Sequence, residues 1–142
     1  MITIATRLGM IACRYLVTGF NEKRYMSAPE IAEFYNMNVR ALMPALRQLT
    51  RVGILHSRIG GCNPGFIFSR NPKEVTLFQV LVALEGYIRF PCCRELVPSL
   101  NCGCHSKEVC ETFLLMDEVI ESVTAKLNSI SMADYARRYN SK

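Results

Sequence analysis

The sequence is poor in histidine and lacks the common catalytic motifs. Its 142 residues include only two histidines, His56 and His105. Neither belongs to an evident Cys-His-Asp arrangement of the kind that activates a nucleophilic cysteine. No glycine loop follows a predicted strand and opens a helix, so the usual phosphate-cradling motif is missing too. We therefore expect a protein that is not an enzyme.

Long apolar runs are also absent, although half of the residues are hydrophobic. The stretch "FQVLVALEG" is far shorter than the roughly 20 residues of a membrane-spanning helix. Arg7 and Arg14 interrupt the apolar N-terminal stretch, where a signal peptide needs an unbroken run. We expect a soluble, cytoplasmic protein with no membrane partner, built from one core and an appended element.

Acidic residues are scarce in the first half of the chain. Residues 1–73 contain ten Lys and Arg but only three acids, Glu22, Glu30 and Glu33, a net charge of +7, whereas residues 74–142 carry a net charge of −2. A polyanion would bind the basic half. The alternative is a basic surface that binds no partner. A recognisable binding motif is needed to decide between the two.

Apolar periodicity and capping residues predict three helices in this basic half. Ile4, Leu8, Ile11 and Tyr15 form one stripe, which predicts a helix over residues 3–18. The sequence "SAPE" is a capping box in which Ser27 accepts from the backbone near Glu30 and Glu30 reaches back, so a short helix is expected to reach Tyr35. Asn38 can cap a third helix, "VRALMPALRQLTRVG", whose inward stripe is Val39, Leu42, Leu46 and Leu49.

The second and third of these helices form a helix-turn-helix pattern. Arg40, Arg47 and Arg51 lie off the apolar stripe of the third helix, where they can reach a DNA groove and its phosphates. Pro44 is expected to bend that helix. The candidate DNA-binding residues are Ser27, Asn38, Arg40, Arg47, Arg51 and Arg58.

A β-hairpin is predicted after the helix-turn-helix. The segments "ILHSR", "IGGCNPG" and "FIFSR" read as strand, turn and strand, with Arg58 and Arg70 near the base. A helix capped by Thr76 and Gln79 follows and stops at Gly86. The expected fold class is mainly α with a small β-hairpin wing, a winged helix-turn-helix followed by a long C-terminal dimerisation helix. A winged helix that binds protein instead of DNA is the alternative.

Five of the seven cysteines lie in "CCRELVPSLNCGCHSKEVC", residues 92–110. Structural disulfides are disfavoured because cytosolic thiols are kept reduced and seven is an odd number. Soft thiolates suit iron-sulfur clusters and zinc alike, and the Cys-Gly-Cys-His run with Cys110 could complete a tetrahedral zinc site. A metal-free thiol sensor also stays open. Outside the run, Cys13 is expected to be a packing residue and Cys62 an exposed thiol.

A heptad pattern follows the cysteine run. Its apolar residues predict a helix that either pairs with a second copy of the chain or packs within its own domain. They are Phe113, Met116, Ile120, Val123, Leu127 and Ile130.

The order of these features resembles the winged-helix transcriptional regulators of the IscR and NsrR type, over nearly the whole chain. The matching pieces are "SAPEIAEFYNMNVRALMPALRQLTRVGILHS", a Gly-rich wing, "VTLFQVLVALEG", the clustered cysteines and "LNSISMADYAR". The resemblance implies a homodimeric bacterial regulator that binds a palindromic operator on double-stranded DNA. It further implies an iron-sulfur cluster, two-iron or four-iron, that senses redox state, nitric oxide or iron status.

The same resemblance implies which cysteines are ligands. Cys104 and Cys110 match the family's spaced pair, and the first ligand is Cys92 or Cys93. The fourth ligand is Cys102, His105, the other member of Cys92 and Cys93, or a group from the partner's first helix. Two departures stand out: the wing "GGCNPG" is one residue longer than usual, and Phe113 stands where some members have histidine. The expected division is residues 1–86 for DNA binding, 87–111 for the sensor loop, and 112–142 for the dimerisation helix and tail.

Overall fold

A computed structural model describes residues 2–104 and 106–140 of the chain. It divides into two compact units, Met1–Gly86 with Leu127–Lys142, and Tyr87–Lys126. The expected DNA-binding domain ends at Gly86, and so does the first of the two segments that make up the first unit. The second segment, from Leu127 onward, was expected to belong to the dimerisation helix and tail. Across the described ranges, no helix is long and apolar enough to cross a membrane.

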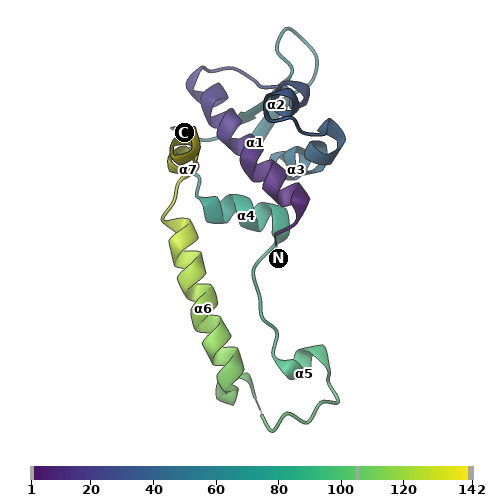
Figure 1. Cartoon of the computed structure of the whole chain (residues 1–142), viewed down its shortest axis with the longest axis vertical. Helices are drawn as coiled ribbons and strands as arrows, with labels where there is room; N and C mark the ends of the chain where they lie inside the picture. The colour runs from purple at the N-terminus through teal and green to yellow at the C-terminus, as the bar shows by residue number, and fades with distance from the viewer. Residues whose placement is uncertain (1, 105, 141–142) are drawn as a thin grey trace. The chain divides into compact units, whose positions relative to one another are not determined.

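The first unit contains five helices and one hairpin in the part of the chain that the structure describes (Figure 1). Four helices begin at side chains that accept from a free first-turn amide: Thr3, Ser27, Asn38 and Thr76. The elements are α1 (Ile4–Asn21), α2 (Ala28–Tyr35), α3 (Val39–Arg51), β1 (Leu55–Arg58), β2 (Gly65–Phe68), α4 (Leu77–Glu85) and α7 (Met132–Asn140).

The predicted start of α2 is confirmed, but only half of the predicted capping box forms. The Ser27 hydroxyl accepts from the Glu30 amide at 3.2 Å. The Glu30 carboxylate does not reach back, because it binds the Arg24 guanidinium through both oxygens at 2.8 and 3.1 Å. It also accepts from the Tyr15 hydroxyl at 3.0 Å. This charge-assisted network ties α1 to α2.

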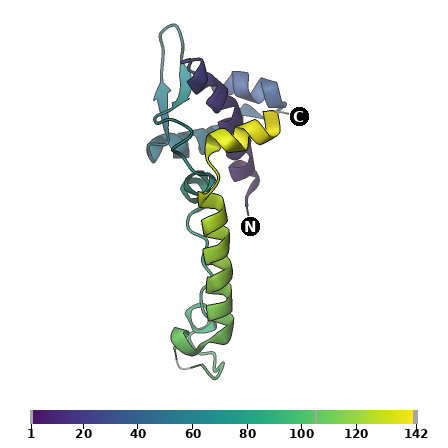
Figure 2. The ribbon, with the colours of Figure 1, turned by 90° about the vertical axis from the view of Figure 1, so that its left-hand side faces the viewer.

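The hairpin confirms the predicted strand, turn and strand. β1 and β2 are antiparallel, with Leu55 opposite Phe68 and Arg58 opposite Gly65. The loop between them projects beyond the helices of the first unit (Figure 2). Phe66 also exchanges two backbone hydrogen bonds with Met26, at 2.8 and 2.9 Å. Because Gly65 has φ 143 and a Cβ there would collide with the Met26 backbone, only glycine fits this close approach. The hairpin is thus fixed to the segment that precedes α2.

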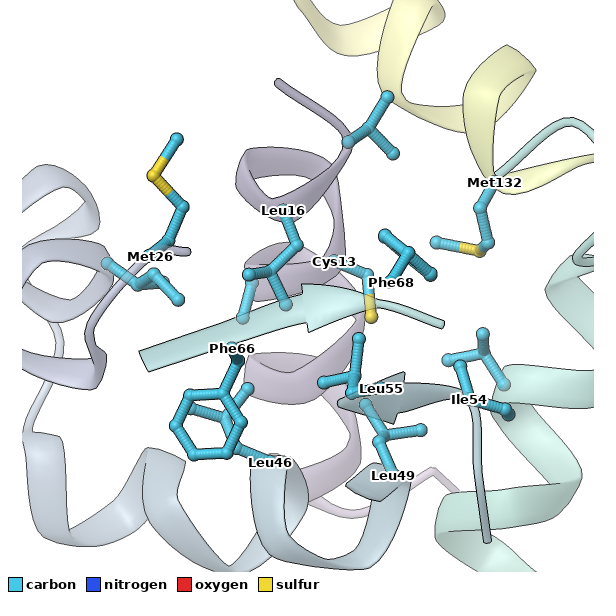
Figure 3. Packing of buried hydrophobic residues seen from close by; sticks show 14 of the residues in the cluster. Cys13, Leu16, Met26, Leu46, Leu49, Ile54, Leu55, Phe66, Phe68 and Met132 are labelled. Atoms are coloured by element: carbon cyan, nitrogen blue, oxygen red, sulfur yellow. The ribbon is translucent and has the colours of Figure 1, made fainter. Parts of the chain in front are cut away.

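The core of the first unit lies between α1, α3, the hairpin and α7 (Figure 3). Fully buried side chains from each contribute, among them Leu16, Leu46, Leu55 and Met132. Cys13 is completely buried in this cluster, as expected from the sequence, and Cys62 is exposed. Burial of this many aliphatic side chains, at about 1.5–3 kcal/mol each, is the main force that holds the helix-turn-helix against α1.

The second unit carries the cysteine run and most of the long helix. Its elements are α5 (Cys93–Leu96), a 3-10 turn η1 (Lys107–Val109) and α6 (Glu111–Asn128), of which the last two residues are assigned to the first unit. The prediction that the heptad pattern continues as helix through Ile130 is wrong, because α6 ends at Asn128. Ile130 is 8% exposed in the first unit's core, and its carbonyl accepts from the Leu77 amide at 2.8 Å.

Candidate nucleic-acid interface and cysteine pocket

A pocket of about 640 Å³ lies between the helix-turn-helix and the hairpin. Four of the six predicted DNA-binding residues line it, contributed by the start of α2, the outer face of α3 and the end of β1. These four are Ser27, Arg47, Arg51 and Arg58. Three guanidinium groups around one concave surface create a positive field that favours phosphate.

The side chains in this pocket differ in the contacts that hold them in place. The Arg58 guanidinium lies 4.2 Å from the centre of the Tyr25 ring, a cation–π contact that fixes its direction. Arg51 donates to the Gln48 side chain, which itself donates to the Ala83 carbonyl at 3.0 Å. The Ser27 hydroxyl is already used as a helix cap. The arginines are therefore the groups available to a ligand.

Asn38 and Arg40 do not line the pocket. The Asn38 side chain accepts from the Arg40 amide at 2.8 Å, so it serves as the N-cap of α3. The Arg40 side chain is exposed on the first turn of that helix. In helix-turn-helix proteins, the N-terminal residues of the second helix contact base edges. Base contact by Arg40 therefore stays a prediction, and Asn38 is the cap of the helix that carries it.

The sequence interpretation missed an apolar part of this surface. Met43 and Ile59 line the same pocket, and Ile59 is 97% exposed at the end of β1. Gly60 and Gly61 follow with φ of 75 and 76, where side-chain residues are strained, and they turn the chain away. An isoleucine directly before two glycines in a predicted wing was the available signal. Apolar side chains in this position can contact sugars or the edges of a groove.

All five cysteines of the run line one pocket of about 270 Å³ in the second unit. Residues up to 18 positions apart are brought together because α5 and η1 fold over the connecting loop. The cysteines are Cys92, Cys93, Cys102, Cys104 and Cys110. The resemblance implied that three of these thiols converge, those of Cys104, Cys110 and one of Cys92 and Cys93, and it left the fourth position open.

The thiols of Cys102, Cys104 and Cys110 interact. A hydrogen bond with Cys110, then burial, raises the pKa of Cys104 to about 11. The pKa of Cys102 is lowered, first by a backbone hydrogen bond from Cys104 and less by the charge of Arg94. Unequal thiols side by side are suited to metal ligation or to disulfide exchange.

Charged side chains close the rim of the cysteine pocket. Arg94 donates to the Cys104 carbonyl at 3.3 Å. Lys107 forms an ion pair with Glu95 and lies 5.7 Å from the centre of the Phe113 ring. These contacts join α5 to η1, and a cationic rim favours anionic thiolates within the pocket.

The donor set fits a thiolate-bound iron-sulfur cluster or zinc in its chemistry, because soft sulfur ligands suit both. Across residues 2–104 and 106–140, however, no three Cys, His, Asp or Glu side chains are close enough to hold a metal ion. His105, a candidate for the fourth ligand, lies outside the described residues. Ligation would therefore require the thiols to draw closer within the pocket.

The two sides of α6 differ in exposure. Phe113 and Ile120 of the predicted heptad seam line a small pocket with Ile88 and Phe90 of their own unit. Leu127 packs against the core of the first unit. The apolar side chains most exposed on α6 are Leu114, Leu115, Val119 and Val123, of which only Val123 belongs to the predicted heptad seam. Leu115, Val119 and Val123 recur every four residues and form one apolar stripe, here named the outer stripe.

Residues 2–138 match the model of the Rrf2 family, described as iron-dependent transcriptional regulator. BadM of Rhodopseudomonas palustris, named as an HTH-type transcriptional regulator, is 33% identical over 81 residues, or 57% of this chain and 50% of that protein. The chain thus matches about half the length of this curated relative.

Solved structures share the fold. IscR of T. potens superposes with a TM-score of 0.73 at 22% identity, covering 97% of this chain and 87% of that one. CymR of B. subtilis, titled the global cysteine regulator, gives a TM-score of 0.75 at 19% identity, covering 97% of both chains. An oxidised form of Staphylococcus aureus CymR gives 0.69 at 18% identity, covering 96% of this chain and 95% of that one. The winged-helix fold predicted from the sequence is therefore confirmed.

Proposed function

The chain belongs to the Rrf2 family of transcriptional regulators, and from that premise we propose that it is a cytoplasmic repressor whose DNA binding is controlled through its cysteine pocket. Members of this family bind DNA and are not enzymes, as the sequence predicted. The proposed input is redox state, nitric oxide, or iron and iron-sulfur status. The proposed output is occupancy of a palindromic operator by a homodimer.

The convergence of five thiols in one pocket carries this proposal. We assign Cys104, Cys110 and one of Cys92 and Cys93 as ligands of an iron-sulfur cluster with two or four irons. Cys102, His105, the other member of Cys92 and Cys93, or a group from the partner subunit supplies the fourth. When bound, such a cluster provides a charge and a ligation state that change with oxidant, nitric oxide or iron supply. The cationic rim of Arg94 and Lys107 offsets the negative charge of the thiolates.

The arginines around the pocket between α3 and the hairpin support DNA as the target. Arg47, Arg51 and Arg58 face one surface, and acidic side chains do not line it among the residues described. Phosphates on a DNA strand supply the regular negative charge that so one-sided a basic surface favours. We assign Arg40 to base contact and Arg58 to the backbone, because Tyr25 holds the latter beside the wing.

A two-fold axis would make the protein match a palindromic operator. The outer stripe of α6 supports this assembly, because it leaves three apolar side chains on a helix that has no buried residue among those described. Isolated surface apolar residues are ordinary, but a regular stripe along one helix face is typical of helix pairing.

Anaerobic reconstitution tests the cluster directly. The full chain is incubated with iron and sulfide without oxygen, and visible absorption and bound iron are measured beside bound zinc. Brown protein with stoichiometric iron, and operator affinity that differs between loaded and metal-free forms, is the expected result. Colourless protein with stoichiometric zinc would contradict the proposed input and leave the DNA-binding assignment intact.

A metal-free thiol sensor is the second candidate, favoured by the contact between the Cys102, Cys104 and Cys110 thiols. An added oxidant of the disulfide class, such as oxidised glutathione, could join two of these sulfurs while its own disulfide is reduced to two thiols. The observation that selects this candidate is a protein that binds no iron but changes operator affinity with such an oxidant, reversibly with dithiothreitol.

A further inference from the structure

A second, aromatic pocket lies in the first unit, with no cysteine in its lining. Its volume is about 440 Å³, within the range of roughly 300–1,000 Å³ that small-molecule sites occupy. The side chains come from α1, from the end of α2 and from the end of α7. They are Arg14, Tyr15, Thr18, Phe34, Tyr35 and Tyr139.

Among the residues that the structure describes, Arg14 is the only charged one in this lining. Its guanidinium carbon lies 4.7 Å from the centre of the Tyr139 ring and 5.3 Å from that of Tyr35. Its Nε atom is buried and has no hydrogen-bond partner. A guanidinium stays protonated in proteins, so the charge cannot be relieved by proton loss.

Among residues 2–104 and 106–139, no carboxylate forms an ion pair with Arg14. Glu30 is close enough to accept from the Tyr15 hydroxyl, but both of its oxygens are bound by Arg24. The bonds from Arg24 are the main reason why the pKa of Glu30 lies below its ordinary value. Glu30 and Arg24 therefore form a closed pair, and the positive charge of Arg14 remains for an anion.

The rest of the wall is aromatic and suits a flat apolar body. The ring centre of Phe34 lies 4.8 Å from those of Tyr15 and Tyr35, and Tyr139 meets Tyr135 edge to face with ring centres 5.1 Å apart. Inorganic anions would leave these rings without a partner, and a cation would be repelled by Arg14. A molecule with one carboxylate and one ring satisfies both parts of the pocket.

We propose that this pocket binds a small aromatic monocarboxylate, with its carboxylate on Arg14 and its ring against the tyrosines and Phe34. This gives the chain a small-molecule site that is separate in its residues from the cysteine pocket. The site joins α1, α2 and α7, and it does not depend on metal loading or on DNA binding.

Calorimetric titration of the full chain tests the proposal with phenylacetate and 3-phenylpropionate. Acetate supplies the anion alone, and 2-phenylethanol supplies the ring alone. The test variant is Arg14→Gln, and Arg7→Gln is the matched control because it makes the same charge change at an exposed position of α1. Arg14→Lys keeps the charge and covers the case in which Arg14→Gln does not fold, which circular dichroism and thermal melting report.

Saturable binding of at least one ring carboxylate to wild type and to Arg7→Gln is expected. Affinity should fall about tenfold or more in Arg14→Gln, since a charge-assisted hydrogen bond is lost. Arg14→Lys should bind more weakly than wild type because it loses the planar fork. The proposal is overturned if neither ring carboxylate binds, or if 2-phenylethanol binds as well as the ring carboxylates do. It is also overturned if Arg14→Gln binds them with the affinity of wild type. Where Arg14→Gln is unfolded, the affinity of Arg14→Lys decides in the same way.

Discussion

The thiols of Cys104 and Cys110 line the same pocket, and the influence of Cys110 is the main reason why the pKa of Cys104 rises to about 11. The two residues sit on either side of η1, which bends the chain so that five intervening residues bring both sulfurs together. A pair held in this way can present two thiolates to one metal, and metal binding then displaces their protons. The geometry leads to the first prediction.

Serine at Cys104 or Cys110 should abolish the visible chromophore of the reconstituted protein. Hydroxyl oxygen is a poor ligand for the soft iron of a cluster, whereas the winged-helix core makes no use of this loop. Visible absorption and bound iron provide the measurement, and circular dichroism checks the fold. Cys62→Ser, at an exposed thiol outside the pocket, is the control. A Cys104→Ser protein that still turns brown would remove this pair from the ligand set.

Serine at Cys92 and at Cys93, one at a time, should identify the remaining family ligand. Both thiols line the pocket. Because only one of them is assigned as a ligand, only one substitution is expected to remove the chromophore. Cys102→Ser tests whether Cys102 is the fourth ligand. If it is, its loss makes the cluster more labile in air. If its thiol faces solvent instead, its loss leaves the stability of the cluster unchanged. The readout is the decay of absorption after exposure to oxygen. Full stability in all three variants would contradict a cluster in this pocket.

Arg40→Ala should weaken operator binding by about 1–3 kcal/mol and reduce discrimination between operator and scrambled DNA. The side chain is exposed on the first turn of α3, which reads base edges in helix-turn-helix proteins. Fluorescence anisotropy at fixed salt measures both duplexes, and Arg7→Ala is the control. Unchanged affinity and discrimination would mean that Arg40 does not contact the bases of the operator.

Arg58→Ala should instead weaken binding to both duplexes alike. Tyr25 holds this guanidinium at the base of the wing, where phosphate contact is expected. Losing one phosphate contact lowers the slope of log affinity against log salt by about 1. Anisotropy titrations at several salt concentrations provide that slope. A selective loss on the operator duplex would mean that Arg58 reads sequence.

The network of Arg24, Glu30 and Tyr15 should make stability depend on acid pH. Arg24 lowers the pKa of Glu30 below its ordinary value of 4.5, so the stabilisation from this network is fully present above pH 4.5 and is lost as pH falls through the folded pKa. Urea unfolding should find Glu30→Gln less stable than wild type near neutral pH. The difference should shrink below about pH 4.5. Glu33→Gln, at an exposed position of α2, should show no such convergence.

Local sequence signals predicted most of the fold because caps and apolar periods act within one turn of helix. Ser27, Asn38 and Thr76 start the helices that they were expected to start. Glu30 did not complete its capping box, because a stronger partner, Arg24, lies within reach. Ile130 fits the heptad by spacing alone, but the helix ends two residues earlier and the core of the first unit takes the side chain.

The sites were less predictable because they depend on residues far apart in the chain. Convergence of Cys92 and Cys110 follows from the fold of the intervening loop, which no period encodes. The aromatic pocket joins Arg14 to Tyr139 across most of the chain. The sequence showed Arg14 only as a residue off the stripe of α1. Its orphaned Nε becomes visible only when the surrounding rings are in place.

The last prediction concerns which face of α6 pairs with a second copy. Val119 is 47% exposed on the outer stripe, whereas Ile120 lines a pocket within its own unit. Val119→Asp would bring two unpaired carboxylates together across the two-fold axis, so the protein should become monomeric while each protomer keeps its fold.

Ile120→Asp is the matched control, one residue further along the same helix. It should destabilise the second unit, because the charge would be placed against Ile88 and Phe90. Light scattering gives the mass of each variant, and circular dichroism with thermal melting gives its stability. A dimeric Val119→Asp protein beside a folded, monomeric Ile120→Asp protein would assign pairing to the heptad seam of Phe113, Met116 and Ile120. That result would also mean that Ile88 and Phe90 leave the seam when two copies meet.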